Sequence, residues 1–397
     1  MTKPIEVFKL EGGEYEMGKQ QGTHFRLQIR QLYDALTSSE EFLASKPFLI
    51  PKFLYRKLAN LVLSKKIKEP IKEYFPSQWA FLEGLSDGSG LAMSKILFLQ
   101  AIDAIGTQIS NYTVGENAVP SLNNCSAVGI AAKKSSTSGV LMIKNWDGPE
   151  FLGEFTIFRK LVPSEDNKFS TIGSGVSGLI GINNGINEKG LSIVYNYAYP
   201  KNIGDKGASA MILIRGALET CSTVEETVSY LKKYPRLGGA NIMVADLNGD
   251  LAVLEVGPDR IEVRRQGDDG EKSYLICTNH YLTSEMRELE IPRNAVYTEN
   301  AAASFQGKSV HKTSILRYKN ALEILKNQAP HQISLNFLNK EIQSSHGPDN
   351  EPSEFTFCNH GEEISTGFGV MIDVKNKEFY ATLEKPCEGT MQNLTKN

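Results

Sequence analysis

The sequence predicts an α+β protein in which a helical first third precedes a strand-rich body that begins at Cys125. Residues 15–43, 51–73 and 77–86 carry apolar side chains at three- and four-residue spacing with few β-branched residues, which is typical of helices. A polar loop containing Pro and Gly, residues 114–124, follows this part. Beyond this loop, short β-prone runs alternate with turn sequences. The pattern therefore predicts helices before the loop and mainly strands after it.

The body alternates predicted strands with predicted helices. Its first half contains five expected strands, at residues 125–131, 139–145, 155–159, 179–182 and 191–197. Apolar positions at helical spacing then predict a helix over residues 208–233. Three later strands, at residues 273–278, 367–373 and 378–383, flank a helix predicted at residues 314–327. We therefore divide the chain into a helical N-terminal segment, 1–124, and a body, 125–397, that together form one fold unit.

Residues 241–255 predict a β-hairpin, because an Asn-Gly turn lies between two alternating runs. The turn belongs to the pentad Asp246-Leu-Asn-Gly-Asp250, which has some likeness to a calcium loop. The remaining ligands and the closing glutamate of a twelve-residue loop are missing, so we interpret the pentad as a turn.

Composition and charge exclude several classes of function. The chain has 397 residues, 41% hydrophobic and 22% charged, which is typical of a globular protein with a large core. A net charge of -3 argues against nucleic acid or an anionic membrane as a partner and favours a small-molecule substrate. Neither a signal-peptide pattern nor an apolar run of about 20 residues is present, so we expect a cytoplasmic protein.

Cysteine and histidine spacing gives no indication of a metal. The five cysteines are Cys125, Cys221, Cys277, Cys358 and Cys387. Their odd number and the absence of a C-x-x-C pair argue against a disulfide framework or a zinc knuckle. The six histidines show neither H-E-x-x-H nor another short ligand spacing, so the sequence leads us to expect no metal and no cofactor.

One dinucleotide-like motif is misleading. Gly173-Ser-Gly-Val-Ser-Gly178 fits the G-x-G-x-x-G pattern, which in nucleotide-binding folds opens a helix. Here a strand and a turn are expected after it, without a βαβ unit, so we expect no nucleotide site.

Cys125 is the candidate nucleophile. It lies at the mouth of the first strand of the body, directly after Asn124 and the polar loop. If the bond after Asn124 were cut, Cys125 would become a chain terminus whose α-amine, with a pKa of about 7.7 to 8.0, can take the thiol proton near neutral pH. The alternative is that Cys125 is a small buried core residue, which is the usual fate of an unpaired cysteine.

Motifs spread along the chain strengthen the first interpretation. They are Gly13-Glu-Tyr-Glu-Met-Gly18-Lys-Gln-Gln-Gly22; Cys125-Ser126; Lys144-Asn145-Trp146-Asp147; Gly185-Ile-Asn-Glu-Lys-Gly-Leu191 leading to Asn196; Asp246 with Glu255; Thr278-Asn279-His280; and Ser314-Ile-Leu-Arg317-Tyr318. In this order they resemble the cysteine-type N-terminal nucleophile hydrolases, in particular the isopenicillin N acyltransferase family. Each motif is weak alone, whereas the ordered set covers roughly three quarters of the chain.

The resemblance implies a fold and an activity. The expected fold is a four-layer αββα sandwich, with residues 1–124 staying attached after self-cleavage between Asn124 and Cys125. The expected activity is attack of the Cys125 thiol on the amide or thioester of a small acylated molecule, including acyl-coenzyme A substrates, to give an acyl-enzyme. Because no coenzyme A signature is visible, hydrolysis is favoured over acyl transfer. Self-association is compatible with such a fold.

Two polar residues are expected beside Cys125. Asp147 follows it by 22 positions, at the end of an antiparallel strand that returns its carboxylate toward the new amine. Asn279 ends an apolar strand, and by resemblance its amide forms the side-chain half of the oxyanion hole. The alternatives are a turn carboxylate for Asp147 and a cap or turn amide for Asn279.

The resemblance assigns two further catalytic positions. A backbone N–H at or beside Asn196 would complete the oxyanion hole, unless Asn196 is an ordinary strand-end residue. Arg317, on a predicted helix, would reach the nucleophile, favour the thiolate and pair with Asp147, unless it is a solvated helix residue. Strand alternation points His280 away from Asn279, so we do not assign it as the base.

Two positions differ from the related enzymes. Bile-salt and penicillin V hydrolases have arginine where this chain has Lys144, and relatives closer to the acyltransferase often have glycine where it has Asn124. Lys144, Trp146 and Tyr197 are candidate substrate-binding residues. Trp146 and Tyr197 also belong to a group of aromatic side chains near the motifs that indicates either an apolar acyl pocket or plain core. The aromatic members are Trp146, Phe151, Phe155, Tyr195, Tyr197 and Tyr281.

Two rival interpretations remain open. The first is a catalytically silent binding protein that keeps the fold, which predicts an uncut chain and no labelling of Cys125 by thiol electrophiles. The second is a conventional cysteine protease that pairs a cysteine with His280, His311 or His360 and needs no free amine at residue 125.

Overall fold

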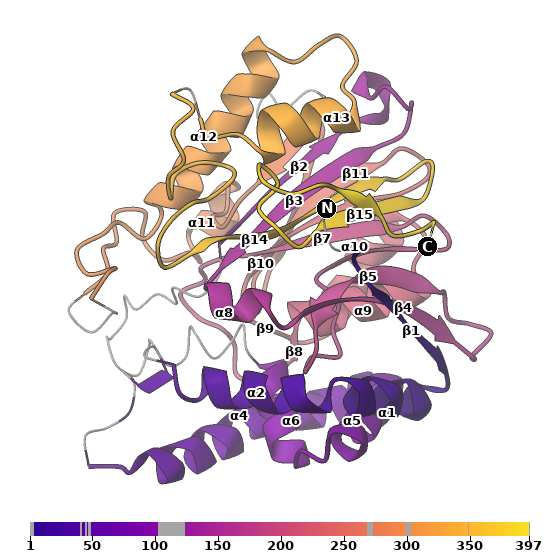
Figure 1. Ribbon diagram of the computed structural model, residues 1–397, viewed down its shortest axis with the longest axis vertical. Helices are drawn as coiled ribbons and strands as arrows, with labels where there is room; N and C mark the ends of the chain where they lie inside the picture. The colour runs from indigo at the N-terminus through magenta and orange to yellow at the C-terminus, as the bar shows by residue number, and fades with distance from the viewer. Residues whose placement is uncertain are drawn as a thin grey trace.

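The computed structural model describes residues 4–396 except 40–41, 44–45, 47–48, 102–123, 268–272, 299–302 and 348. Two β-sheets lie face to face in its centre, with helices on both outer faces (Figure 1). Helices α9 (Ala210–Thr220) and α10 (Val224–Lys233) pack on the larger sheet, and helix α12 (Lys312–Asn327) with the π-helical turn η3 (Leu338–Gln343) packs on the smaller one. The fold is therefore α+β with αββα layers, as predicted.

The smaller sheet carries Cys125. It has six antiparallel strands in the order β13-β2-β3-β14-β15-β16. Their bounds are β13 (Tyr274–Cys277), β2 (Asn124–Ile130), β3 (Leu141–Gly148), β14 (Ser365–Asp373), β15 (Glu378–Thr382) and β16 (Gln392–Asn393). Every residue of β2 and β3 is buried, because one face of these strands meets the other sheet and the second face meets α12 and η3.

The larger sheet has eight strands in the order β1-β4-β5-β6-β7-β10-β11-β12. Their bounds are β1 (Val7–Gly12), β4 (Thr156–Pro163), β5 (Thr171–Val176), β6 (Asn184–Asn187), β7 (Ser192–Tyr197), β10 (Ala240–Ala245), β11 (Leu251–Val256) and β12 (Ile261–Arg265). Strand β1 pairs in parallel with β4, so the N-terminal segment adds an edge strand that we did not predict. Strand β5 contains the first four residues of the dinucleotide-like motif, and residues 179–182, which we predicted as a strand, lie in the connection between β5 and β6.

In the described part of the N-terminal segment, five helices lie together at the bottom of Figure 1: α1 (Glu14–His24), α2 (Arg26–Leu36), α4 (Lys52–Tyr74), α5 (Pro76–Ser89) and α6 (Met93–Gln100). Helices α1 and α5 approach each other backbone to backbone, because both carry glycines four residues apart, Gly18 with Gly22 and Gly84 with Gly88. A Cβ at Gly18 would overlap the carbonyl of Phe81. The early glycine motif therefore serves helix packing.

Three predictions for the body can be compared directly with the structure. The helix expected at 208–233 is two helices, because Thr223 starts α10 with a capping box that it forms with Glu226. The hairpin at 241–255 is confirmed as β10 and β11. Asp246 acts as a turn residue, since its Oδ1 accepts the backbone N–H of Asn248 at 2.9 Å. The remaining short elements are η1 (Ala132–Lys134), α8 (Glu150–Gly153), β8 (Ala208–Ser209), β9 (Arg236–Leu237), α11 (Ser284–Arg287) and α13 (Leu335–Phe337).

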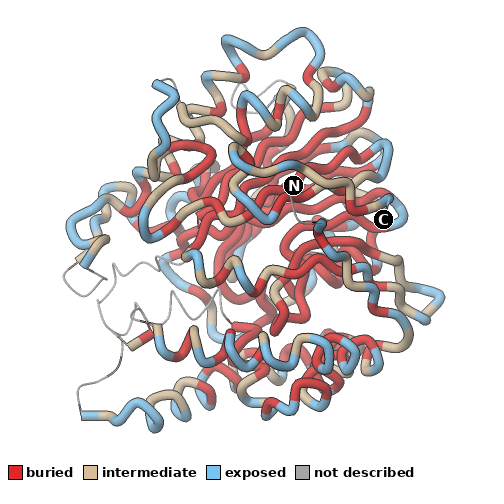
Figure 2. The backbone as a smooth tube through the Cα atoms, viewed as in Figure 1, coloured by how far each residue is buried: buried red, intermediate tan, exposed pale blue. Residues whose placement is uncertain are grey.

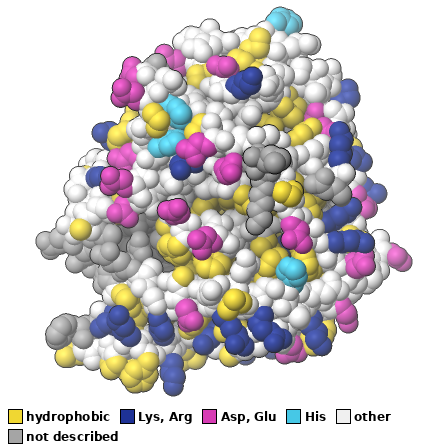
Figure 3. All heavy atoms as spheres, viewed as in Figure 1, with side chains coloured by type: hydrophobic (Ala, Val, Ile, Leu, Met, Phe, Trp, Pro, Cys, Tyr) yellow, Lys and Arg dark blue, Asp and Glu magenta, His cyan; other side chains and the backbone are white. Residues whose placement is uncertain are grey.

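Burial follows the layers. Figure 2 shows the buried residues concentrated in the two sheets and on the inward sides of the helices. On the face in Figure 3, acidic and basic side chains are interspersed over the body, and Lys and Arg gather over the N-terminal helices. No helix in the described ranges is both long and apolar enough to cross a membrane.

Candidate active site

Cys125 is positioned by the pairing of β2 with β3. Asn124 lies opposite Asp147 and Cys125 opposite Trp146 in this antiparallel register. Side chains alternate along a strand, so Cys125 and Trp146 face the space between the sheets, whereas Ser126 and Asp147 face helix α12. The thiol and the carboxylate therefore flank the start of β2 from opposite faces of the sheet.

Asp147 is fully buried and only partly paired. Its Oδ1 accepts a hydrogen bond from the Thr366 hydroxyl at 2.7 Å, and its Oδ2 lies 3.5 Å from Arg317 Nη1. Burial raises the pKa of Asp147 from 3.8 to about 6, against the opposing effects of Arg317 and the Thr366 hydrogen bond. This carboxyl group can therefore exchange a proton close to neutral pH.

Asn279 holds the backbone nitrogen of Cys125. Its Oδ1 accepts the Cys125 N–H at 2.9 Å, and its Nδ2 donates to the Tyr197 carbonyl at 2.9 Å. The backbone N–H of Asn279 in turn donates to Ser314 Oγ at 2.8 Å, which fixes the residue against α12. Nδ2 carries two hydrogens, so one remains to be donated to an oxyanion.

Arg317 connects the other groups. Nη1 donates to the Cys125 carbonyl and to Ser126 Oγ, both at 2.6 Å, and Nη2 donates to Asn279 Oδ1 at 2.8 Å. The side chain is fully buried and forms the ion pair with Asp147. The guanidinium thus contacts the backbone of Cys125. Hydrogen bonds join Arg317 to Cys125 and Asn279, and an ion pair joins it to Asp147.

Asn196 and Lys144 lie between the sheets. Asn196, on β7, donates from Nδ2 to the Cys277 carbonyl on β13 at 2.8 Å, so its side chain bridges the two sheets instead of contacting Cys125. Lys144 is fully buried, and its Nζ has no hydrogen-bond partner among the described residues. That ammonium lies 5.8 Å from the ring centroid of Tyr195.

A small apolar cavity borders the thiol. Its lining includes Cys125, Trp146, Tyr195, Tyr197 and Phe368, while Phe151, Phe155 and Tyr281 of the predicted aromatic group lie elsewhere. Its volume of about 40 Å³ is far below the roughly 300 to 1,000 Å³ of ligand pockets. Burial also raises the pKa of the Cys125 thiol, and the cations of Lys144 and Arg317 oppose that rise. In the intact chain the thiol is therefore protonated at neutral pH and needs a base to react.

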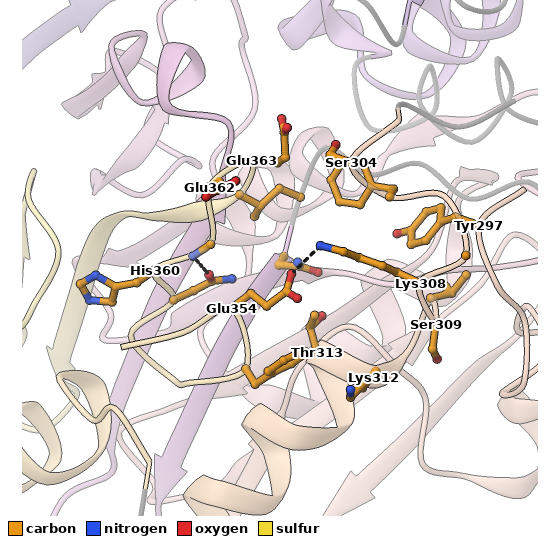
Figure 4. A pocket seen from close by; sticks show the side chains of 18 residues that line it. Tyr297, Ser304, Lys308, Ser309, Lys312, Thr313, Glu354, His360, Glu362 and Glu363 are labelled. Atoms are coloured by element: carbon orange, nitrogen blue, oxygen red, sulfur yellow. Dashed lines mark hydrogen bonds and ion pairs between the residues drawn. The ribbon is translucent and has the colours of Figure 1, made fainter. Parts of the chain in front are cut away.

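A larger cavity of about 720 Å³ opens beside Asn124 (Figure 4). Lys308 and Glu354 face each other across it as an ion pair with an Nζ–Oε2 distance of 3.6 Å, and Glu362 and Glu363 lie along one side. Close by, the Tyr199 hydroxyl donates to Asn124 Oδ1 at 2.7 Å. The bond after Asn124 thus lies between a small cavity at Cys125 and a large one at Asn124.

Sequence reasoning missed Tyr199 and Thr366 as members of this site, and it gave Ser314 no role although Ser314 opens the motif that contains Arg317. Thr366 lies 219 residues from Asp147 in the sequence, and Ser314 lies 35 residues from Asn279. Tyr199 lies three residues after Asn196 and belongs to none of the motifs. An isolated hydroxyl residue carries no local signal, so only the fold reveals these contacts.

The histidines of the protease alternative have other partners. His280 Nδ1 lies 2.7 Å from Ser314 Oγ, and burial lowers the pKa of His280 well below its ordinary range. His311 Nε2 bonds the Ile291 carbonyl at 2.9 Å, and His360 Nε2 lies 3.3 Å from Cys387 Sγ. None of these contacts forms a pair with Cys125.

Metal-ligating side chains do not gather around Cys125. Within the described ranges, one group of at least three His, Cys, Asp or Glu side chains has ligand atoms close enough to share an ion. It consists of His346, Cys358, His360 and Cys387, near the edge of the larger cavity.

Comparison with known proteins gives one family. The model of the acyl-coenzyme A:6-aminopenicillanic acid acyl-transferase family matches residues 133–384. The match covers Asp147, Asn279 and Arg317 and begins 8 residues after Cys125. No curated protein matches the sequence.

Several solved structures are similar to part of this chain. A mutant of the conjugated bile acid hydrolase of Clostridium perfringens is 15% identical over 68% of this chain and 93% of its own, with a TM-score of 0.42. A Caenorhabditis elegans orthologue of N-acylethanolamine-hydrolyzing acid amidase is 17% identical over 63% and 93%, with a TM-score of 0.39. Penicillin V acylase from Agrobacterium tumefaciens is 16% identical over 68% and 86%, with a TM-score of 0.38. With TM-scores below 0.5, these likenesses support no conclusion about the site.

Proposed function

Because this chain belongs to the acyl-coenzyme A:6-aminopenicillanic acid acyltransferase family of N-terminal nucleophile hydrolases, we propose that it is a self-processing amidohydrolase whose nucleophile is Cys125. Its substrate is a small acylated molecule with a linear amide or thioester bond. The chain is made as a precursor and is cut between Asn124 and Cys125.

One observation carries this proposal: the backbone nitrogen of Cys125 is already held by Asn279 Oδ1 at 2.9 Å in the uncut chain. After cleavage this nitrogen is the α-amine. Asn279 would keep it in place, and Asp147, which pairs with residue 124 across the strands, would balance its charge. The amine then takes the proton of the Cys125 thiol, whose pKa is raised by burial.

Self-cleavage proceeds through an acyl shift. The Cys125 sulfur attacks the carbonyl carbon of Asn124, the proton of the thiol passes to the amide nitrogen as the C–N bond breaks, and a thioester joins the two residues. Water then hydrolyses the thioester, which leaves a carboxylate on Asn124 and frees the thiol and the amine. The Tyr199 hydroxyl, bonded to Asn124 Oδ1 at 2.7 Å, is suited to hold the side chain before the cut bond.

Substrate turnover repeats the same chemistry. The thiolate attacks the acyl carbonyl, the second hydrogen of Asn279 Nδ2 and a backbone N–H at or beside Asn196 hold the oxyanion, and water resolves the acyl-enzyme. Apolar side chains around Cys125, including Trp146, Tyr197 and Phe368, favour an aliphatic or aromatic acyl group. Lys144 Nζ, buried and without a hydrogen-bond partner among the described residues, is the group that would meet a polar end of the substrate.

The mass of the purified protein tests processing. We expect two fragments that separate between residues 124 and 125 in denaturant. Asn124→Asp should still be cut, because the thiol route does not use the asparagine side chain, whereas Cys125→Ala should stay whole. Cys221→Ala, a buried cysteine elsewhere in the fold, is the matched control and should be cut normally. Activity in a chain that remains whole would overturn the processing claim.

A substrate panel tests the reaction class. Short and long N-acyl amides and acyl thioesters are incubated with the cleaved protein, with and without an added amine. Release of free acid without the amine supports hydrolysis, and an acylated amine as main product would assign acyl transfer instead. If Cys125 resists thiol electrophiles and no acyl compound reacts, the protein is the catalytically silent alternative.

A further inference from the structure

A second group of reactive side chains lies away from Cys125, where three separate segments of the body meet. Cys358 and His360 flank Asn359, His346 follows η3, and Cys387 lies in the turn after β15. One ligand atom from each of the four side chains lies within 4.8 Å of all the others. Cys358 is fully buried and the other three are partly buried, so the group is shielded while an ion can still reach it.

Shorter distances within the group fit a tetrahedral ion. The sulfur atoms of Cys358 and Cys387 are 3.4 Å apart, and Cys387 Sγ is 3.3 Å from His360 Nε2. Zinc bonds sulfur at about 2.3 Å and imidazole nitrogen at about 2.0 to 2.1 Å, so the edges of a Cys₂His₂ tetrahedron are roughly 3.3 to 3.8 Å. The four atoms therefore need only small adjustments to surround one ion.

The imidazoles are oriented for this role. The rings of His346 and His360 meet edge to face with centroids 4.9 Å apart. His346 Nε2 is buried and has no hydrogen-bond partner among the described residues, which is costly for an imidazole unless another ligand meets it. Figure 4 shows the His360 ring at the margin of the larger cavity, pointing away from Lys308 and Glu354.

We propose that His346, Cys358, His360 and Cys387 bind one Zn²⁺ ion as a structural site. Two thiols lose their protons to the solvent on binding, and two neutral imidazoles complete the shell, so the occupied site carries no net charge. Soft thiolates with imidazoles favour zinc over the magnesium or calcium that carboxylates would select. The proposed site departs from the expectation of no metal drawn from the sequence. The four ligands are separated by 12, 2 and 27 residues, and this spacing matches no short metal-binding motif.

The ion would fasten the segment that supports Asp147. Asn359, between the two central ligands, donates its backbone N–H to Thr366 Oγ1 at 2.8 Å and accepts the Thr366 N–H at 2.9 Å. That same Thr366 hydroxyl donates to Asp147. Zinc at Cys358 and His360 would therefore fix Asn359, and Asn359 would hold Thr366 in position to donate its hydrogen bond to Asp147.

Metal content tests the proposal on the full-length protein, purified under reducing conditions. Elemental analysis should find about one zinc per chain. After removal of zinc with a chelator, added Co²⁺ should give the visible bands of tetrahedral cobalt and a thiolate-to-cobalt charge-transfer band. Hydrogen exchange should quicken in residues 345–366 of the metal-free protein, because the segment loses its link to Cys387.

Matched variants locate the site. Cys387→Ser and His360→Gln should lose the zinc and the charge-transfer band, whereas Cys221→Ser and the exposed His331→Gln should keep both. Far-ultraviolet circular dichroism separates loss of metal from loss of fold. Metal retained in both site variants, a wild-type chain that takes up neither zinc nor cobalt after reduction, or a Cys358–Cys387 disulfide that persists under reducing conditions would each overturn the proposal.

Discussion

Two buried ionic groups in this protein differ in how completely they are paired. The first joins helix α1 to helix α9: Arg215 donates from Nε to Glu219 at 2.6 Å and from Nη2 to Glu14 at 2.5 Å, and Lys168 pairs with both carboxylates. It contains two cations and two anions, and its charged atoms are all satisfied. Such a group resists change, because removing one member leaves a buried charge without a partner.

The second group surrounds Cys125. Lys144, Asp147 and Arg317 supply two cations and one anion, all fully buried. Lys144 Nζ, Asp147 Oδ2 and Arg317 Nε have no hydrogen-bond partner among the described residues, although Asp147 Oδ2 lies 3.5 Å from Arg317. Unsatisfied buried groups are expensive and are retained mainly at sites where a substrate or a reaction intermediate completes them. Both groups are buried. They differ in how many of their charged atoms have a partner, and this difference distinguishes the group around Arg215 from the group around Cys125.

The largest effect should follow from Cys125→Ala. We expect activity to fall by at least about 10⁴-fold, because the nucleophile is lost and the chain is no longer cut. Compared with the uncut precursor, the stability of the uncut variant should change by less than about 1 kcal/mol, since the loss of one sulfur atom leaves a small space. Turnover of the best acyl substrate and urea unfolding measure the two effects. A large loss of stability would place Cys125 with the structural group.

Arg215→Met tests the paired group. The free energy of unfolding should fall by about 3 to 5 kcal/mol, because Glu14 and Glu219 would be left facing each other in the core with Lys168 alone. Arg265→Met, which breaks an exposed ion pair with Glu225, is the control and should cost less than about 1 kcal/mol. Urea unfolding measures the free energy of unfolding of both variants. Equal decreases in the two variants would contradict the assignment of Arg215 to a structural network.

The pH dependence of stability should report on Asp147 in the uncut chain. The pKa of its carboxyl is 3.8 when exposed and about 6 in the fold, so the folded state binds more protons between these values. The stabilisation is present below about pH 4 and is lost as the pH rises through about 6, a change of about 3 kcal/mol.

The Cys125→Ala background keeps the chain whole for this measurement. Urea midpoints from pH 4 to pH 7 are compared with and without Asp147→Asn, and the difference between the two curves is the contribution of Asp147. Parallel curves would show that the carboxyl titrates at its ordinary pKa.

The smallest effect is expected for Thr366→Val in the active protein. Its hydroxyl bonds the charged form of Asp147, so removing it should raise the pKa of that carboxyl and move the acid limb of the activity profile upward by about 1 pH unit. Thr366→Ser, which keeps the hydroxyl, is the matched control. An unchanged limb with lower overall activity would mean that Thr366 only supports packing.

The sequence predicted elements with a strong local pattern. Helix α12 and the β10–β11 hairpin fall where periodicity and the Asn-Gly turn placed them. The apolar run at 179–182 was wrongly predicted as a strand, because its carbonyls are used by a buried guanidinium: Arg159 donates to Leu179 at 3.0 Å and to Ile180 at 2.7 Å. Strand β1 escaped prediction because Lys9 and Glu11 give it the charged pattern of a sheet edge.

For the site, sequence order identified the residues that the fold brings together, Cys125, Asp147, Asn279 and Arg317. It did not identify Thr366 or the group around Cys358, because their partners come from segments that meet only after the sheets form. The catalytic roles of Cys125, Asp147, Asn279 and Arg317 stay predictions, which the variants above test. The polar loop predicted at 114–124, before the expected cut, lies outside the described residues except for Asn124, which begins β2.

If the chain is cut after Asn124 as proposed, the pairing of strand β1 has a consequence for the mature protein. It is paired in register with β4, from Val7 opposite Phe158 to Gly12 opposite Pro163, so the fragment ending at Asn124 is built into the sheet of the fragment that begins at Cys125. Once the connecting bond is gone, unfolding releases two molecules instead of one. The thermal midpoint of the mature protein then rises with its concentration, refolding becomes a bimolecular encounter, and heating a dilute sample inactivates it irreversibly.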